Sequence, residues 1–178
     1  MFLDESGLLL LPVVRRTWSR CGQTPVLRHV GRNHKQVSAI AALCISPDRR
    51  EVRLYFQLLV DENFNSVAGL EFLKQLARHF RDPLLLVWDR AKIHRGLQIE
   101  VFLDVLEWRQ FYCPPYVPEL DPVEYLWSYL KTKPLANPAC PEVAPLAAAG
   151  RRHARSLQHK TALLRSFIRR GPLSLRLR

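Results

Sequence analysis

Residues 84–94, L-L-L-V-W-D-R-A-K-I-H, decide the fold of this chain. Four apolar residues and a Trp form a short run that predicts a buried strand. Asp89 follows at once, so its carboxylate is expected at the rim of a sheet, where open α/β sheets place their sites. A buried carboxylate without a partner is costly, and a metal ion is the simplest partner for Asp89.

The patterns on both sides of this stretch predict an α/β sheet of mixed direction. The expected strands are an apolar start interrupted by the polar residues 4–7, and runs at 36–45, 51–59, 84–88 and 108–113. The expected helices lie at 67–80, 96–106, 123–131, 143–159 and 161–169. Their apolar stripes place Val67, Val101 and Val105 on the buried side. A strand–helix–strand step favours parallel strands, and in this order the first and fourth strands are plausible neighbours.

The composition indicates a folded, basic domain. The chain has 178 residues, of which 48% are hydrophobic, and this excludes a disordered chain. Its formal charge is +11, and nine of the 27 Lys and Arg residues but no acid lie from Arg151 onward. Such a charge predicts a polyanionic partner, most simply nucleic acid, with a solvated basic surface as the alternative. We expect no membrane span, a cytosolic location and reduced cysteines, with a zinc site at Cys21, His29 and His34 as a remote alternative.

Three carboxylates form the candidate catalytic and metal site. Asp4 lies on the first strand, Asp89 ends the fourth, and Glu124 lies on the helix that follows the proline-rich loop 114–118. Three hard oxygen ligands suit Mg²⁺ or Mn²⁺, and two such ions could clamp the attacking and leaving oxygens of a phosphodiester. Alternatively, both acids have structural roles: Glu124 interacts favourably with the helix dipole, and Asp89 caps a helix.

Basic and aromatic residues supply candidate DNA contacts. Those close to the three carboxylates are Arg90, Lys92, His94 and Lys131. Those in the polar segment after the first strand are Arg15, Arg16, Trp18 and Arg20, where cations alternate with an aromatic ring. The alternative for this second group is a hairpin arm that packs on its own domain or on a partner subunit.

Four motifs carry a family resemblance. They are D-E-S-G at 4–7, R-T-W-x-x-x-G-Q-T-P at 16–25, W-D-x-x-x-I-H at 88–94, and P-P-Y-x-P-E-L-D-P-V-E-x-x-W at 114–127. Between Asp89 and Glu124 there are 34 residues, which is the family spacing. In these features residues 1–137 resemble the catalytic domain of DDE-type transposases of the mariner superfamily, in its bacterial insertion-sequence branch.

The resemblance implies an RNase H-like fold, a mixed five-stranded sheet with helices on both faces. It implies that Asp4, Asp89 and Glu124 bind two Mg²⁺ or Mn²⁺ ions, with no further cofactor. These would cut DNA at transposon ends and join the freed end to target DNA, in a bacterial, nucleoid-associated protein. His94 would orient groups or pack near the site. Residues 138–178 would form a basic helical extension that is partly disordered.

The chain also departs from the family pattern. Asp121 stands where relatives carry Asn, and a helix cap is the favoured interpretation for it. No helix-turn-helix region precedes the first strand, so the chain is expected to be a fragment. Its expected partners are a separately encoded DNA-binding protein and a second copy of the chain, which would form a homodimer. The alternatives are a non-catalytic DNA-binding remnant and another RNase H-like nuclease that cuts without joining.

Overall fold

The computed structural model describes residues 1–9, 20–23, 36–133, 135, 143–173 and 175–178. Its strands are β1 Phe2–Leu9, β2 Gln36–Ile45, β3 Val52–Val60, β4 Leu85–Trp88 and β5 Arg109–Tyr112. Its helices are α1 Ser66–Ala77, α2 Leu97–Val105, α3 Pro122–Thr132, α4 Val143–Gln158 and α5 Thr161–Arg170. Two short 3₁₀ turns, η1 Lys92–His94 and η2 Pro118–Leu120, precede α2 and α3.

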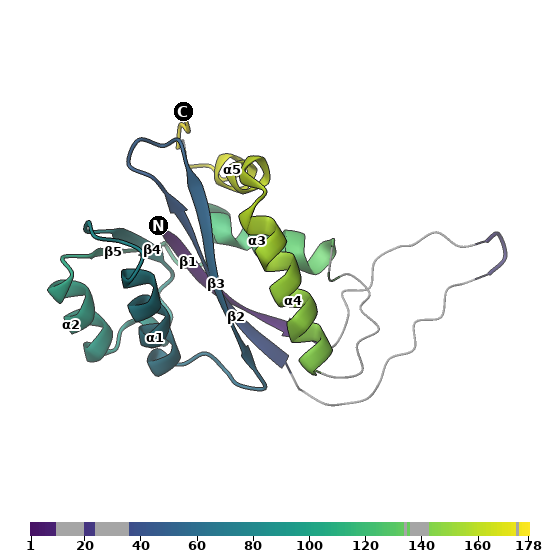
Figure 1. The fold of residues 1–178 in the computed structure, drawn as a ribbon, viewed down its shortest axis with the longest axis horizontal. Helices are drawn as coiled ribbons and strands as arrows, with labels where there is room; N and C mark the ends of the chain where they lie inside the picture. Colours follow the sequence, from purple (N-terminus) through teal and green to yellow (C-terminus); the bar gives the residue numbers. More distant parts are fainter. Residues whose placement is uncertain (10–19, 24–35, 134, 136–142, 174) are drawn as a thin grey trace.

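The five strands form one mixed sheet in the order β3-β2-β1-β4-β5 (Figure 1). The three amino-terminal strands are antiparallel neighbours, whereas β4 runs parallel to β1 and β5 runs parallel to β4. The predicted mixed sheet is therefore confirmed, and so is the predicted pairing of the first and fourth strands. This pairing places the end of β4 beside the start of β1.

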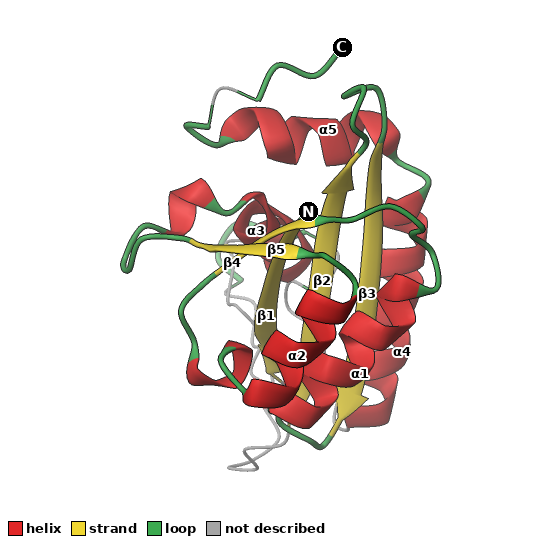
Figure 2. Cartoon of the chain, turned by 90° about the vertical axis from the view of Figure 1, so that its left-hand side faces the viewer, coloured by secondary structure: helices red, strands yellow, loops and turns green. Residues whose placement is uncertain are grey.

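Helices cover both faces of the sheet, as predicted (Figures 1 and 2). The helices α1 and α2 close one apolar core, whose fully buried side chains include Leu3, Leu73, Trp88 and Leu103. The helices α3, α4 and α5 close a second core, which includes Leu126, Leu146, Leu157 and Leu164. The sheet is thus the middle of three layers, buried on both sides.

Two expectations about single elements are wrong. The first strand is not interrupted at residues 4–7, because each of these residues pairs with a residue of β2. Val67, Val101 and Val105 are exposed rather than buried. In α2 the buried pair is Ile99 and Leu103, and a residue two positions away points to nearly the opposite side of a helix.

The two carboxyl-terminal helices fold onto the same sheet. Leu157 of α4 and Phe167 of α5 belong to the core that α3 closes, and Gln158 Nε2 donates to the carbonyl of Leu54 at 2.9 Å. A boundary between 1–137 and 138–178 stays a prediction. His29 and His34 of the remote zinc alternative lie outside the described residues. Over the described ranges, none of the helices has the length and apolarity needed to cross a membrane.

Candidate active site

Strand register brings Asp4 and Asp89 together. Phe2 of β1 is in register with Val87 of the parallel strand β4. Two residues farther along each strand lie Asp4 and Asp89, so the two carboxylates stand at the same level on adjacent strands. Side chains two residues apart share a face, and Phe2 belongs to the core closed by α3. Asp4 therefore faces α3.

Helix α3 supplies the third carboxylate and is anchored to β1. Trp127 Nε1 donates to Asp4 Oδ2 at 2.9 Å, and Lys131 Nζ donates to Ser6 Oγ at 2.7 Å. These bonds fix the helix along the strand. Glu124 lies in the first turn of α3 and is exposed, on the side of its amino terminus. An acid in the first helical turn is favoured by the helix dipole, which explains part of its place there.

Asp121 caps α3, as predicted, and is also part of the site. Its Oδ1 accepts the backbone N–H of Val123 at 2.8 Å, and Pro122 occupies the start of the helix. The side chain is buried and lines the same pocket as Asp4 and Glu124. Capping and site membership are therefore properties of one residue.

A pocket of about 350 Å³ lies between these elements. The described residues that line it are Asp4, Asp89, Arg90, Ala91, Cys113, Pro114, Pro115, Tyr116, Val117, Pro118, Asp121 and Glu124. Among these residues Arg90 carries the only positive charge. The proline-rich segment forms one wall, and its prolines hold the backbone in a narrow range of φ. Tyr116 is almost fully exposed on this wall, with a positive φ of 62°.

Two carboxyl groups in this pocket, those of Asp4 and Asp121, have raised pKa values. Burial, and then the charges of Glu124 and Glu5, raise the pKa of Asp4 to about 7. Burial raises the pKa of Asp121 to about 8; the bond from Val123 opposes this shift, and the charges of Asp4, Glu124 and Asp89 add to it. A site that crowds negative charge in this way favours protons or a cation.

His94 braces Asp89 from the opposite side of the sheet. Its Nδ1 lies 2.9 Å from Asp89 Oδ1, and its Nε2 lies 2.9 Å from Glu5 Oε1. The ring stacks on Trp88 with 4.2 Å between centroids and 4° between planes. Burial lowers the pKa of His94, but the bond with Glu5 and the charges of Glu5 and Asp89 outweigh it and raise the pKa.

The prediction that His94 contacts DNA is wrong, because its side chain is only 2% exposed and both ring nitrogens face carboxylates. Its orienting or packing role agrees with the structure. The sequence did not predict that Glu5 contacts His94 or that Trp127 donates to Asp4. Strand alternation contains the signal for Glu5, which must face away from Asp4, and Trp127 lies three residues after Glu124 on one helix.

The other candidate DNA contacts are spread over the molecule. Arg90 lines the pocket and Lys92 is exposed at the start of η1. Arg20 is exposed in a turn closed by the bond from Gln23 N to its carbonyl at 3.0 Å. Lys131 is half-buried and holds α3 to β1. Three further candidates lie outside the described residues: Arg15, Arg16 and Trp18.

The donor chemistry of the pocket fits a hard divalent cation. Carboxylate oxygens are the ligands that Mg²⁺ and Mn²⁺ prefer, and burial together with neighbouring carboxylates raises the pKa values of Asp4 and Asp121. As the side chains stand, no three His, Cys, Asp or Glu residues in the described part of the chain form a group that could hold an ion. Glu124 is exposed, so its rotamer can change at little cost.

Comparison with known proteins gives a family match and structural matches. The model of a family described as DDE superfamily endonuclease matches residues 1–146. Crystal structures of the Mos1 mariner paired end complex with Mn and with Mg each match with a TM-score of 0.62 and 19% sequence identity. They cover 83% and 87% of this chain, and 45% and 47% of the matched chains.

A pre-cleavage Mos1 transpososome also matches, with a TM-score of 0.57 and 19% identity over 76% of this chain and 42% of that chain. A search of curated proteins gives no match. The chain spans less than half the length of the solved chains named here. These likenesses show the fold, and the predicted RNase H-like architecture is confirmed.

Proposed function

Because the chain belongs to the DDE superfamily endonuclease family, we propose that it is a transposase catalytic domain that cleaves DNA and transfers the freed strand to a target. One observation carries the proposal most strongly. Parallel pairing of β1 and β4 sets Asp4 and Asp89 side by side, and α3 adds Glu124 to the same pocket. This arrangement suits the charge demands of phosphodiester chemistry.

Asp4, Asp89 and Glu124 would hold two Mg²⁺ or Mn²⁺ ions, which supply activation of the attacking oxygen and stabilisation of the leaving oxygen. The remaining roles belong to the chain itself. His94 and the Ala91 N–H orient Asp89, the latter donating at 2.8 Å. Trp127 orients Asp4 by donating to its Oδ2 at 2.9 Å. Arg90 is placed to meet a phosphate oxygen.

The proposed partners are transposon-end DNA, target DNA and a second copy of the chain. The matched structures are described as paired end complexes and a transpososome, and another match as a Mos1 strand transfer complex, with a TM-score of 0.53 and 21% identity. The net charge of +11 suits a DNA partner. On the insertion-sequence motifs we also propose a bacterial, nucleoid-associated protein of the cytoplasm.

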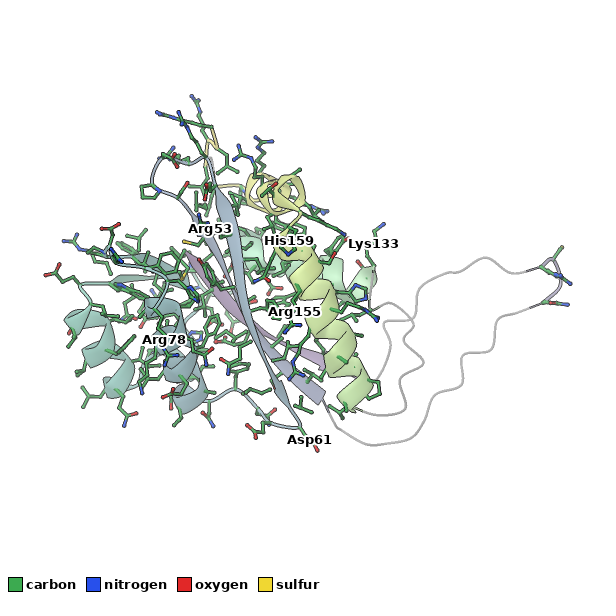
Figure 3. All side chains as sticks on the ribbon, in the orientation of Figure 1. Arg53, Asp61, Arg78, Lys133, Arg155 and His159 are labelled. Atoms are coloured by element: carbon green, nitrogen blue, oxygen red, sulfur yellow. The ribbon has the colours of Figure 1, made fainter. Side chains whose placement is uncertain are left out.

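The test is nicking of supercoiled plasmid DNA with Mn²⁺ or Mg²⁺. We expect the unchanged chain to cut and Asp89→Asn to lose at least about a hundredfold in rate, since the exchange removes one ligand charge. Asp61→Asn is the matched control, because Asp61 is exposed at the far end of β3 (Figure 3). Asn also tolerates its φ of 61°.

The result separates three functions. Cutting that is lost in Asp89→Asn and kept in Asp61→Asn supports the carboxylate site. DNA binding without cutting by any form would instead show a non-catalytic remnant. Cutting without joining, measured with a labelled 3′-hydroxyl end and a target plasmid, would show a nuclease that is not a transposase.

A further inference from the structure

Arginines from three separate segments gather around α5. They form a surface that we name the arginine corner: Arg49, Arg50, Arg165, Arg169, Arg170 and Arg178. Two of them lie in the turn between β2 and β3, three on α5, and one at the carboxyl terminus. Figure 2 shows α5 across the end of the sheet where β2 turns into β3.

Hydrogen bonds hold the three segments of the arginine corner together. Arg165 donates from Nη1 to the carbonyl of Arg50 and from Nη2 to the carbonyl of Arg178, both at 2.5 Å. The backbone N–H of Arg178 donates to the carbonyl of Arg49 at 3.0 Å. The corner is therefore a built surface rather than a run of independent side chains.

The positive charge of this surface has few acidic partners. The sequence contains no Asp or Glu from residue 143 onward. Among the described acids near the corner, Asp48 accepts from Ser46 and Arg50 N and forms a long ion pair with Arg50 Nε at 3.8 Å. Glu51 pairs with Arg53 at 2.6 Å, outside the corner. Six clustered arginines repel one another, and binding of a polyanion removes that repulsion.

One end of the arginine corner reaches the wall of the active-site pocket. The guanidinium of Arg170 lies 5.2 Å from the centre of the Tyr125 ring, and Tyr125 directly follows Glu124. A Cβ placed on Gly171 would come within 3.3 Å of the Glu119 carbonyl in η2. The carboxyl end of α5 is therefore adjacent to the pocket. From there the helix, about 15 Å long, extends away from the pocket.

We propose that the arginine corner binds the phosphate backbone of duplex DNA on one side of the scissile phosphate. The proposal rests on the proposed function, because it assigns a track for the DNA that enters the pocket. Phosphates of one strand lie about 7 Å apart, so α5 spans about two to three of them. The family match ends at residue 146, so most of this surface lies beyond it.

The test is DNA binding, measured by fluorescence anisotropy with a labelled duplex of about 30 base pairs in Ca²⁺, at several salt concentrations. The variant is Arg169→Ala with Arg170→Ala. The control is Arg78→Ala with Arg81→Ala, which removes the same charge. Arg78 caps the carboxyl end of α1, on the other face of the sheet (Figure 3), and the exposed Arg81 follows three residues later. We expect the variant to bind at least about fivefold more weakly and its salt slope to fall by about 1 to 2. The control should change affinity less than about twofold.

A second pair, Arg169→Lys with Arg170→Lys, keeps the charge and should bind within about threefold of the unchanged chain. Lys variants as weak as the Ala variants would trace the loss to the contact between α3 and α5 and overturn the proposal. Equal effects of the Ala variants and the control would also overturn it. The same variants are also tested for binding to duplex RNA and to phosphatidylserine vesicles. A loss of affinity for these probes but not for duplex DNA would overturn the proposal as well. DNA binding in the presence of Ca²⁺ does not require cleavage. A failure of this test is therefore distinct from a failure of the nuclease proposal.

Discussion

At Asp89, one exposed carboxylate is held by two neighbours on its own chain segment, the N–H of Ala91 and the ring of His94. The other ring nitrogen of His94 faces Glu5, so a doubly protonated ring can donate to both carboxylates. The raised pKa of His94 agrees with that charge state. The stack on Trp88 fixes the plane of the ring, and this in turn fixes Asp89.

We therefore expect His94→Gln to lower metal-dependent DNA cleavage by about 10- to 100-fold and to weaken Mn²⁺ affinity by a similar factor. Glutamine lacks the flat ring that stacks on Trp88 and cannot carry the positive charge. The measurement is the cleavage rate as a function of Mn²⁺ concentration. His159→Gln is the control, since His159 is exposed at the end of α4 (Figure 3). An unchanged Mn²⁺ dependence in His94→Gln would contradict the orienting role.

Asp4 and Asp121 lead to a pH dependence. In the unfolded chain both release their protons near pH 4, whereas in the folded, metal-free protein they hold them until about pH 7 and about pH 8. Through these groups the free energy of unfolding falls as the pH rises from about 4 to about 8. Metal ions bind the deprotonated carboxylates, so the increase in melting temperature that Mn²⁺ produces should be larger at about pH 8 than at about pH 6.

The check is thermal unfolding with and without Mn²⁺ at both pH values. In Asp121→Asn, which keeps a capping oxygen for Val123, the metal-free protein should lose less stability across this pH range. An equal effect of Mn²⁺ at both pH values would contradict the assignment of raised pKa values to the metal-binding groups.

At the scale of single elements, α4 shows that burial and not local charge places a helix. It carries Arg151, Arg152 and Arg155 on its exposed side, yet Leu146 and Leu157 are each only 1% exposed against the sheet. At Gly150 an added Cβ would lie 3.3 Å from Leu58 and 3.4 Å from Leu8. Close approach of α4 to the sheet therefore depends on a small residue here.

Leu157→Ala should reduce the free energy of unfolding by about 2 to 5 kcal/mol, because it leaves a cavity between α4 and the sheet. The matched control is Leu97→Ala on α2, where the side chain is 74% exposed and the cost should stay within about 0.5 kcal/mol. Denaturant unfolding measures both. Equal and small effects would mean that α4 is only loosely attached to the core.

At the scale of the whole molecule, the carboxyl-terminal helices complete the domain. The three layers need α4 and α5 to cover the face formed by β2 and β3, where Ala39, Leu43 and Leu54 belong to the same core as Leu164. We therefore expect a chain cut after residue 137 to lack a cooperative unfolding transition, because that apolar face would meet water. Circular dichroism during heating is the measurement. A cooperative melt of residues 1–137 would instead support a domain boundary there.

Local pattern was sufficient for much of the fold. The strands β2, β3 and β4 follow patterns among neighbours in the chain, so the sequence alone predicts them. The buried side of each helix was harder to predict. In α2 apolar residues occur on several sides, and only contact with the sheet decides that Ile99 and Leu103 are inside.

The site divides in the same way. Asp4, Asp89 and Glu124 could be proposed from motif spacing, since a strand end and a helix start are local features that predict where carboxylates project. The roles of Glu5 and Trp127 depend on contacts between residues 89 and 123 positions apart. Such pairs arise from strand register and layer stacking, which no local pattern contains, and so the supports of the site became visible only in the folded chain.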